Sequence, residues 1–101
     1  FIMASQMEGL PVALMEAMAS GLLCIAPARD NIPTVLRTRE TGFLMPDSEQ
    51  ITINKTLNEA CSKYSSYKHL GDNARLEICN NYSYTYAINK WNELLNNLRN
   101  E

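Results

Sequence analysis

The chain starts with two short apolar runs joined by a helix-forming segment, and this pattern restricts the fold more than any other feature. The apolar runs cover residues 1–4 and 22–26. Residues 11–20 between them are rich in Ala, Leu and Met, which favour helices. Pro11 suits the first position of a helix and Gly21 suits its end. Continuous apolar strands joined by a helix are typical of a parallel sheet covered on both faces. We therefore predict a right-handed β-α-β unit over residues 1–26.

The remainder of the chain predicts one more strand and then helices. Residues 27–41 are polar and predict a loop with one helical turn at residues 33–37, and residues 42–45 predict a third strand that Pro46 ends. Asp47 and Gln50 have the spacing of a capping box at the start of a helix. Apolar residues then recur at helical spacing in three stripes. The first is Ile53, Leu57, Ala60 and Tyr64, and the second is Tyr67, Leu70, Ala74 and Ile78. A third helix is expected to start at Ser83, and its stripe is Ala87, Trp91, Leu94 or Leu95, and Leu98. The predicted class is α/β, a Rossmann-like partial parallel sheet of three strands followed by C-terminal helices.

Composition limits the classes of function. With 101 residues, 46% of them hydrophobic and 20% charged, the chain suits one packed domain. A net charge of −2 does not favour nucleic-acid binding. Three cysteines without a close pair and the single His69 predict a reduced cytoplasmic protein with no metal site and no cofactor. Because Phe1 falls inside an expected element, we also expect the chain to be a fragment.

One carboxylate stands out in the first helix, since the segment from Pro11 to Ala19 is otherwise apolar. Burying an unpaired carboxylate costs several kcal/mol. Glu16 is therefore expected at an edge of the buried surface. Two interpretations stay open: a structural pairing with a nearby Lys or Arg, or a contact with the hydroxyls of a ligand.

The start of this helix favours the ligand. With Pro11 first, the cap position falls on Leu10, which has no side-chain acceptor for the free amides of the first turn. An uncapped helix start at the carboxyl end of a parallel strand is a ready anion site. Phosphate at the amides of Val12 and Ala13, with Glu16 one turn further for ribose hydroxyls, describes a nucleotide site.

Residues 5–26, S-Q-M-E-G-L-P-V-A-L-M-E-A-M-A-S-G-L-L-C-I-A, resemble the donor-site signature of GT-B retaining glycosyltransferases. This group is the glycosyl transferases group 1 family, of the family four type. Its signature has two glutamates with seven residues between them, here Glu8 and Glu16. The segments I-P-T-V-L and E-T-G-F-L-M-P follow in the family's order, as do Ala74, Arg75, Tyr82 and Ser83. The resemblance covers residues 1–101 as the C-terminal portion of a nucleotide-sugar-binding domain.

The resemblance implies a role for each residue of the signature. Glu8 would be catalytic and contact the hydroxyls of the donor sugar, and Gly9, Leu10 and Pro11 would bring backbone to the sugar and diphosphate. Val12 and Ala13 would offer amides to phosphate. Leu14 would approach the base, and Glu16 would bind the ribose. The chain departs from the family at Thr34, where a Glu is common, and at Cys24 to Arg29.

These roles imply a donor that is a UDP-, GDP- or ADP-sugar and an acceptor that is a glycan or lipid-linked. The reaction would retain configuration and belong to polysaccharide or glycoconjugate biosynthesis, in the cytoplasm or at the inner face of the membrane. The isolated chain is expected to be inactive and to self-associate through an uncovered strand edge and the last helix. The alternatives are a non-catalytic Rossmann-like binding or scaffolding module and a GT-B phosphorylase or epimerase.

Other residues with reactive or binding side chains are given structural interpretations. His69 is expected at the surface, Cys24 in a buried strand, and Cys61 and Cys79 on helices. The tyrosines Tyr82, Tyr84 and Tyr86, with Trp91, are expected in the core. The arginines Arg29, Arg37 and Arg39 are expected on a solvated loop.

Overall fold

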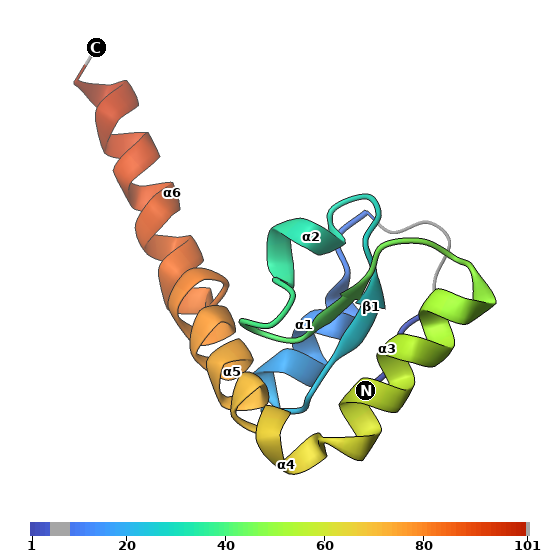
Figure 1. Cartoon of the computed structure of the whole chain (residues 1–101). Helices are drawn as coiled ribbons and strands as arrows, with labels where there is room; N and C mark the ends of the chain where they lie inside the picture. Colours follow the sequence, from blue (N-terminus) through green and yellow to red (C-terminus); the bar gives the residue numbers. More distant parts are fainter. Residues whose placement is uncertain (5–8, 101) are drawn as a thin grey trace.

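The computed structural model describes residues 1–4 and 9–100 (Figure 1). Within these ranges the elements are α1 (Val12–Ala19), β1 (Ile25–Pro27), α2 (Ile32–Val35), β2 (Phe43–Met45), α3 (Gln50–Ser62), α4 (Tyr64–Tyr67), α5 (His69–Asn81) and α6 (Tyr84–Arg99). The class is α/β, with a small parallel sheet followed by helices, as predicted.

The sheet is parallel and has β1 at its centre. Ile25 of β1 lies opposite Phe43 of β2, and Pro27 lies opposite Met45. On the other edge of β1, the N–H of Met3 donates to the carbonyl of Ile25 at 2.9 Å, and Ile2 forms a parallel bridge to Ile25. The first predicted strand is thus a single bridge, and the other two strands are shorter than predicted. The predicted parallel direction of the strands is confirmed.

Successive residues of a strand point to opposite faces of the sheet, and helices cover both faces. The strand residues therefore divide between two core clusters. One core cluster contains Cys24 and Ala26 with residues of the N-terminal segment, α1, α2 and α5, among them Met3, Leu14, Met18, Ile32, Ala74 and Ile78. The other contains Ile25 with residues of β2, α3 and α5, among them Phe43, Met45, Ala60 and Leu70. Most of the predicted apolar stripes of α3 and α5 are therefore in the core, whereas Tyr64 is 52% exposed.

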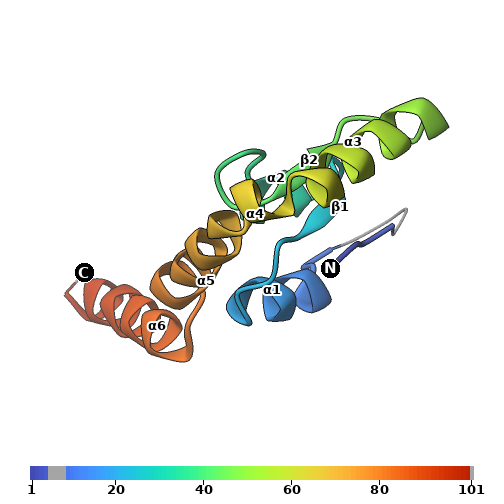
Figure 2. The same cartoon turned by 60° about the horizontal axis from the view of Figure 1, so that its bottom comes forward.

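The C-terminal end of α1 is a tight turn on which α5 packs. Gly21 has a φ of +77°, its N–H donates to Met18 at 2.9 Å, and the N–H of Leu22 donates to Ala17 at 3.2 Å. This pair of bonds is a Schellman motif, which confirms Gly21 as the helix end. A Cβ at Gly71 would lie 2.2 Å from the carbonyl oxygen of Gly21. The absence of a side chain at position 71 therefore allows α5 to run alongside α1 (Figure 2).

Two predicted helix starts are wrong, one by one residue and the other by two. Helix α1 begins at Val12, so that Pro11 rather than Leu10 has the cap position. Helix α3 begins at Gln50, and the Asp47 side chain accepts from the N–H of Glu49 at 2.9 Å. The predicted capping box does not form because Asp47 lies outside the helix and closes a local turn instead.

Helix α6 projects away from the rest of the molecule (Figure 1) and has no buried residue. Ser83 caps it as predicted, accepting from the N–H of Tyr86 at 3.1 Å. Its apolar residues are exposed, and Trp91 is 62% exposed. The placement of Tyr84, Tyr86 and Trp91 in the core is wrong, because α6 buries none of its residues. In the part of the chain that the structure describes, no helix is long and apolar enough to cross a membrane.

Candidate functional site

The start of α1 and the loops that follow β1 and β2 meet at the carboxyl edge of the sheet. Ligands of open α/β sheets bind at this edge. A hydrogen bond of 2.9 Å from Asn31 Nδ2 to the Gly9 carbonyl ties the loop after β1 to the segment that leads into α1. The edge is therefore one continuous surface built from three separate parts of the chain.

The first turn of α1 offers backbone donors to this surface. Pro11, the residue at the cap position, has no side-chain acceptor for the helix amides. The N–H of Val12 donates to the Leu10 carbonyl at 2.9 Å, whereas the N–H groups of Ala13 and Leu14 have no acceptor among the described residues. Such amides suit an anion. The sequence assigns two amides to phosphate. The N–H of Ala13 is available for a ligand, whereas the N–H of Val12 already donates to the Leu10 carbonyl.

Glu16 is exposed and forms no ion pair with any residue that the structure describes. It shares its side of α1 with the exposed Val12 and Ala13, while Leu14, Ala17 and Met18 form the buried side. Glu16 lies outside the buried side, in agreement with the expected position at its edge, because the helix covers the sheet with one side only. Glu16 thus has no structural partner among residues 1–4 and 9–100, and its carboxylate is open to solvent or to a ligand next to Ala13.

Glu8, the predicted catalytic residue, lies outside the described residues. Gly9 and Leu10 are described and exposed, and Pro11 and Leu14 are buried. The predicted site residues from Gly9 to Glu16 therefore form one continuous stretch that enters and follows the first turns of α1. Their exposed members are Gly9, Leu10, Val12, Ala13 and Glu16.

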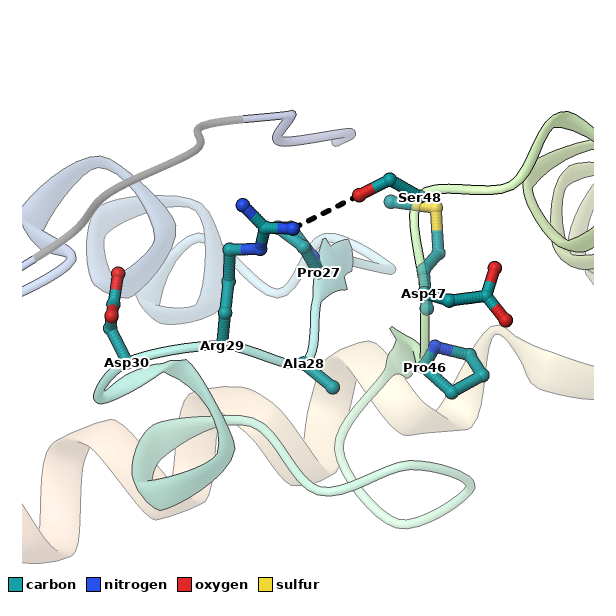
Figure 3. A pocket seen from close by; sticks show the side chains of 8 residues that line it. Pro27, Ala28, Arg29, Asp30, Pro46, Asp47 and Ser48 are labelled. Carbon is teal, nitrogen blue, oxygen red and sulfur yellow. Dashed lines mark hydrogen bonds between the residues drawn. The ribbon is translucent and has the colours of Figure 1, made fainter.

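A pocket of about 290 Å³ opens at this edge, between the loops that follow β1 and β2 (Figure 3). It is lined by Pro27, Ala28, Arg29, Asp30, Met45, Pro46, Asp47 and Ser48. The N–H of Ala28 donates to the Met45 carbonyl at 2.8 Å, and Arg29 Nη2 donates to Ser48 Oγ at 3.0 Å. Sequence analysis placed Arg29 on a solvated loop and missed the pocket. The signal that could have found it is that both loops leave parallel strands at their carboxyl ends.

The other two loop arginines are held by carboxylates away from this edge. Arg37 pairs with Glu40 at 2.6 Å and with Glu77 at 3.1 Å, and these hydrogen bonds raise the pKa of Arg37. Arg39 pairs with Glu59 at 2.6 Å. Both arginines are exposed structural residues, as expected. No group of three or more His, Cys, Asp and Glu in the described ranges is placed to hold a metal ion.

One family model and two protein sequences are similar to this chain. The model of the family described as glycosyl transferases group 1 matches residues 1–77. WcaL of Salmonella typhimurium, a glycosyltransferase named for colanic acid biosynthesis, is 38% identical over 53 residues, which are 52% of this chain and 13% of that protein. An uncharacterized glycosyltransferase of Haemophilus influenzae is 28% identical over 96 residues, which are 94% of this chain and 27% of that protein.

A solved structure shares the fold. Sucrose-phosphate synthase of Thermosynechococcus elongatus matches 96% of this chain with a TM-score of 0.85 and 22% identity, and the match covers 24% of the synthase. At this identity the likeness shows the fold alone. The chain thus spans about a quarter or less of the length of these relatives.

Proposed function

This chain belongs to the glycosyl transferases group 1 family, and we infer that it forms the donor-binding part of a retaining glycosyltransferase. The donor is a nucleotide sugar, and the acceptor is a glycan or a lipid-linked glycan. A role in polysaccharide assembly is supported by the name of the Salmonella relative. Glu8 is proposed to contact the donor sugar at the reacting centre.

The observation that carries this proposal is the pairing of open amides with an open carboxylate on α1. The N–H groups of Ala13 and Leu14 suit the diphosphate, since a helix start favours negative charge. Glu16 lies about one turn further on the exposed side and accepts hydrogen bonds, as a carboxylate that binds ribose hydroxyls must. Gly9, Leu10 and Pro11 would bring backbone to the sugar. Leu14, whose side chain is buried in the first core cluster, would approach the base through its backbone only.

We expect the 101-residue chain alone to transfer sugar slowly or not at all. Transfer needs donor and acceptor to be held together and the leaving charge to be stabilised. The chain matches only 13% and 27% of the two bacterial relatives. A transfer rate for this polypeptide comparable with that of a full-length relative would contradict the expectation.

An NMR titration of the chain with UDP, GDP and ADP tests the donor site. We expect saturable shifts at the amides of residues 9–16 with at least one nucleotide. Glu16→Gln should weaken that binding about tenfold, because it removes a charge-assisted hydrogen bond. Glu93→Gln, an exposed substitution on α6, is the matched control and should bind as the unmodified chain does.

Two results would count against the donor site. Nucleotides that shift no amide in residues 9–16 would show that this chain does not hold the half-site. Binding that is unchanged by Glu16→Gln would remove the ribose role from Glu16. In either case membership of the family would stand on its own evidence.

A further inference from the structure

We propose that a second pocket, between β2 and α3, binds a small monocarboxylate with an apolar tail. Its volume of about 430 Å³ lies within the range for small-molecule sites, about 300–1,000 Å³. Apart from Pro46, it shares no lining residue with the pocket between the loops after β1 and β2. It also contains no residue of the segment 9–16, so the inference does not depend on the proposed donor site.

Two sides of α3 have different surroundings. Ile53, Leu57 and Ala60 belong to the second core cluster. Residues 51, 52, 55, 56 and 59 lie one turn apart on another side and line the pocket. The helix lies beside β2 (Figure 2), whose residues 43 and 44 line the pocket as well. The pocket is therefore built by two packed elements rather than by one loop.

Apolar groups make up one part of the lining. Leu44 is half-buried and Pro46 is exposed, and Ile51 on the first turn of α3 is 82% exposed. An alkyl tail that covers these groups removes apolar surface from water on both partners. The apolar lining therefore favours a ligand with an aliphatic part.

The charged side chains of the pocket leave one positive charge unbalanced. Arg39 pairs with Glu59 at 2.6 Å and donates to the hydroxyl of Tyr67 at 3.3 Å. Lys55 is exposed one turn before Glu59 and forms no ion pair with any residue in the ranges 1–4 and 9–100. The three charges of the lining add up to +1. One carboxylate balances this charge, whereas a phosphate dianion would leave an excess of negative charge near Glu59.

The hydroxyl of Thr38 adds a second donor to the pocket. It accepts from the N–H of Leu44 at 3.3 Å, and its own hydrogen has no acceptor among the described residues. The hydroxyl of Thr56 differs, because it donates to the Thr52 carbonyl at 2.9 Å. A carboxylate accepts at both of its oxygens, so it can bind the Lys55 ammonium and the Thr38 hydroxyl together.

An NMR titration of the 101-residue chain with hexanoate and with hexanol tests the pocket, because the two probes have alkyl chains of the same length and differ in charge. We expect saturable shifts at the amides of residues 38–44 and 51–56 at millimolar concentrations of hexanoate. Hexanol should bind at least about tenfold more weakly, since it lacks the charge that Lys55 attracts. Raising the salt concentration from about 0.05 M to about 0.5 M should weaken the binding of hexanoate but not that of hexanol.

Substitutions at exposed positions separate the charge of the pocket from its apolar lining. Lys55→Gln should weaken the binding of hexanoate about fivefold and leave that of hexanol unchanged, because it removes an exposed charge pair. Ile51→Ser should weaken the binding of both probes, because it removes apolar contact. Lys68→Gln removes an exposed lysine outside the pocket and is the matched control, which should bind both probes as the unmodified chain does.

Four results would overturn the proposal. Hexanoate could give no saturable shift at residues 38–44 and 51–56, or hexanol could bind as tightly as hexanoate. Lys55→Gln could bind hexanoate as the unmodified chain does. Hexanoate shifts confined to α6 would show that the probe binds only the exposed apolar residues of that helix. The donor site is tested separately, since UDP shifts are expected at residues 9–16 and hexanoate shifts are expected elsewhere.

Discussion

At the scale of single residues, Glu59 is the carboxylate whose environment the structure changes most clearly. It accepts a hydrogen bond from the hydroxyl of Tyr67 at 2.8 Å and one from Arg39 at 2.6 Å. The bond from Tyr67, followed by that from Arg39, lowers the pKa of Glu59. The ring of Tyr67 meets that of Phe43 edge-on, with the centroids 4.9 Å apart. These contacts tie α3 and α4 to β2 and its preceding loop.

This arrangement predicts a pH-dependent stability. Because the pKa of Glu59 is lower in the folded chain than in the unfolded chain, ionised Glu59 stabilises the fold above its ordinary pKa of 4.5. The stabilisation is lost as the pH falls through the lowered value. The difference in unfolding free energy between the unmodified chain and Glu59→Gln should therefore shrink below pH 4.5. Urea unfolding at a series of pH values measures it. Tyr67→Phe should reduce the same difference, and a difference that is constant with pH would contradict the prediction.

The three cysteines differ in accessibility and predict a simple labelling pattern. Cys24 is fully buried, which raises the pKa of its thiol, whereas Cys61 and Cys79 are exposed on helices. Alkylation requires an accessible thiolate. Iodoacetamide followed by mass spectrometry should label Cys61 and Cys79 in the folded chain, and Cys24 at least about tenfold more slowly. Labelling of Cys24 at the rate of the other two would show that the first core cluster opens easily.

At the scale of elements, the contact between α5 and the end of α1 depends on Gly71. In an open helix, replacing Gly by Ala stabilises by about 1 kcal/mol. Here a Cβ would lie 2.2 Å from the Gly21 carbonyl oxygen, so the helices would have to separate. We expect Gly71→Ala to lower the free energy of unfolding by about 1–2 kcal/mol. Urea unfolding measures this change, and Asn80→Ala on the exposed side of α5 should stay within about 0.5 kcal/mol. A stabilised Gly71→Ala chain would show that the approach is not tight.

The elements that the sequence predicted well are those set by local chemistry. Gly21 ends α1 through its positive φ and Ser83 caps α6 through its hydroxyl, and both need only their own neighbours. The parallel sheet was predictable because its apolar runs are continuous. Helical spacing gives no reason for a Gly at position 71, because that reason is a contact with Gly21, fifty positions earlier.

The candidate site was predictable only in part, for the same physical reason. The stretch from Gly9 to Glu16 carries a recognisable motif in one segment. The pocket around Arg29 and Asp47 arises because two loops, separate in sequence, are paired through Ala28 and Met45. Glu16 was expected only at an edge of the buried surface, and the structure gives the side of α1 that it shares with Val12 and Ala13. Helical spacing shows which residues share a side of α1 but not which side meets the sheet.

At the scale of the whole molecule, α6 makes the chain extended. The radius of gyration is 16.0 Å, against about 13 Å for a compact domain of 100 residues, and the principal extents are 55 × 27 × 17 Å. The exposed apolar residues of α6 recur at helical spacing and include Ile88, Trp91, Leu94, Leu95 and Leu98. An apolar stripe of this kind on an exposed helix favours association with a second helix.

We therefore expect the 101-residue chain to self-associate through α6. Sedimentation velocity over a range of concentrations should show a monomer that gives way to a dimer, and the emission of Trp91, the single tryptophan, should move to shorter wavelength as it is buried. Leu95→Lys places a charge in the stripe and should shift the transition to at least about tenfold higher concentration. Asn89→Lys adds the same charge to α6 outside the stripe and should leave the transition in place. A chain that stays monomeric at millimolar concentration, or a dimer that Leu95→Lys does not weaken, would show that the exposed stripe does not drive association.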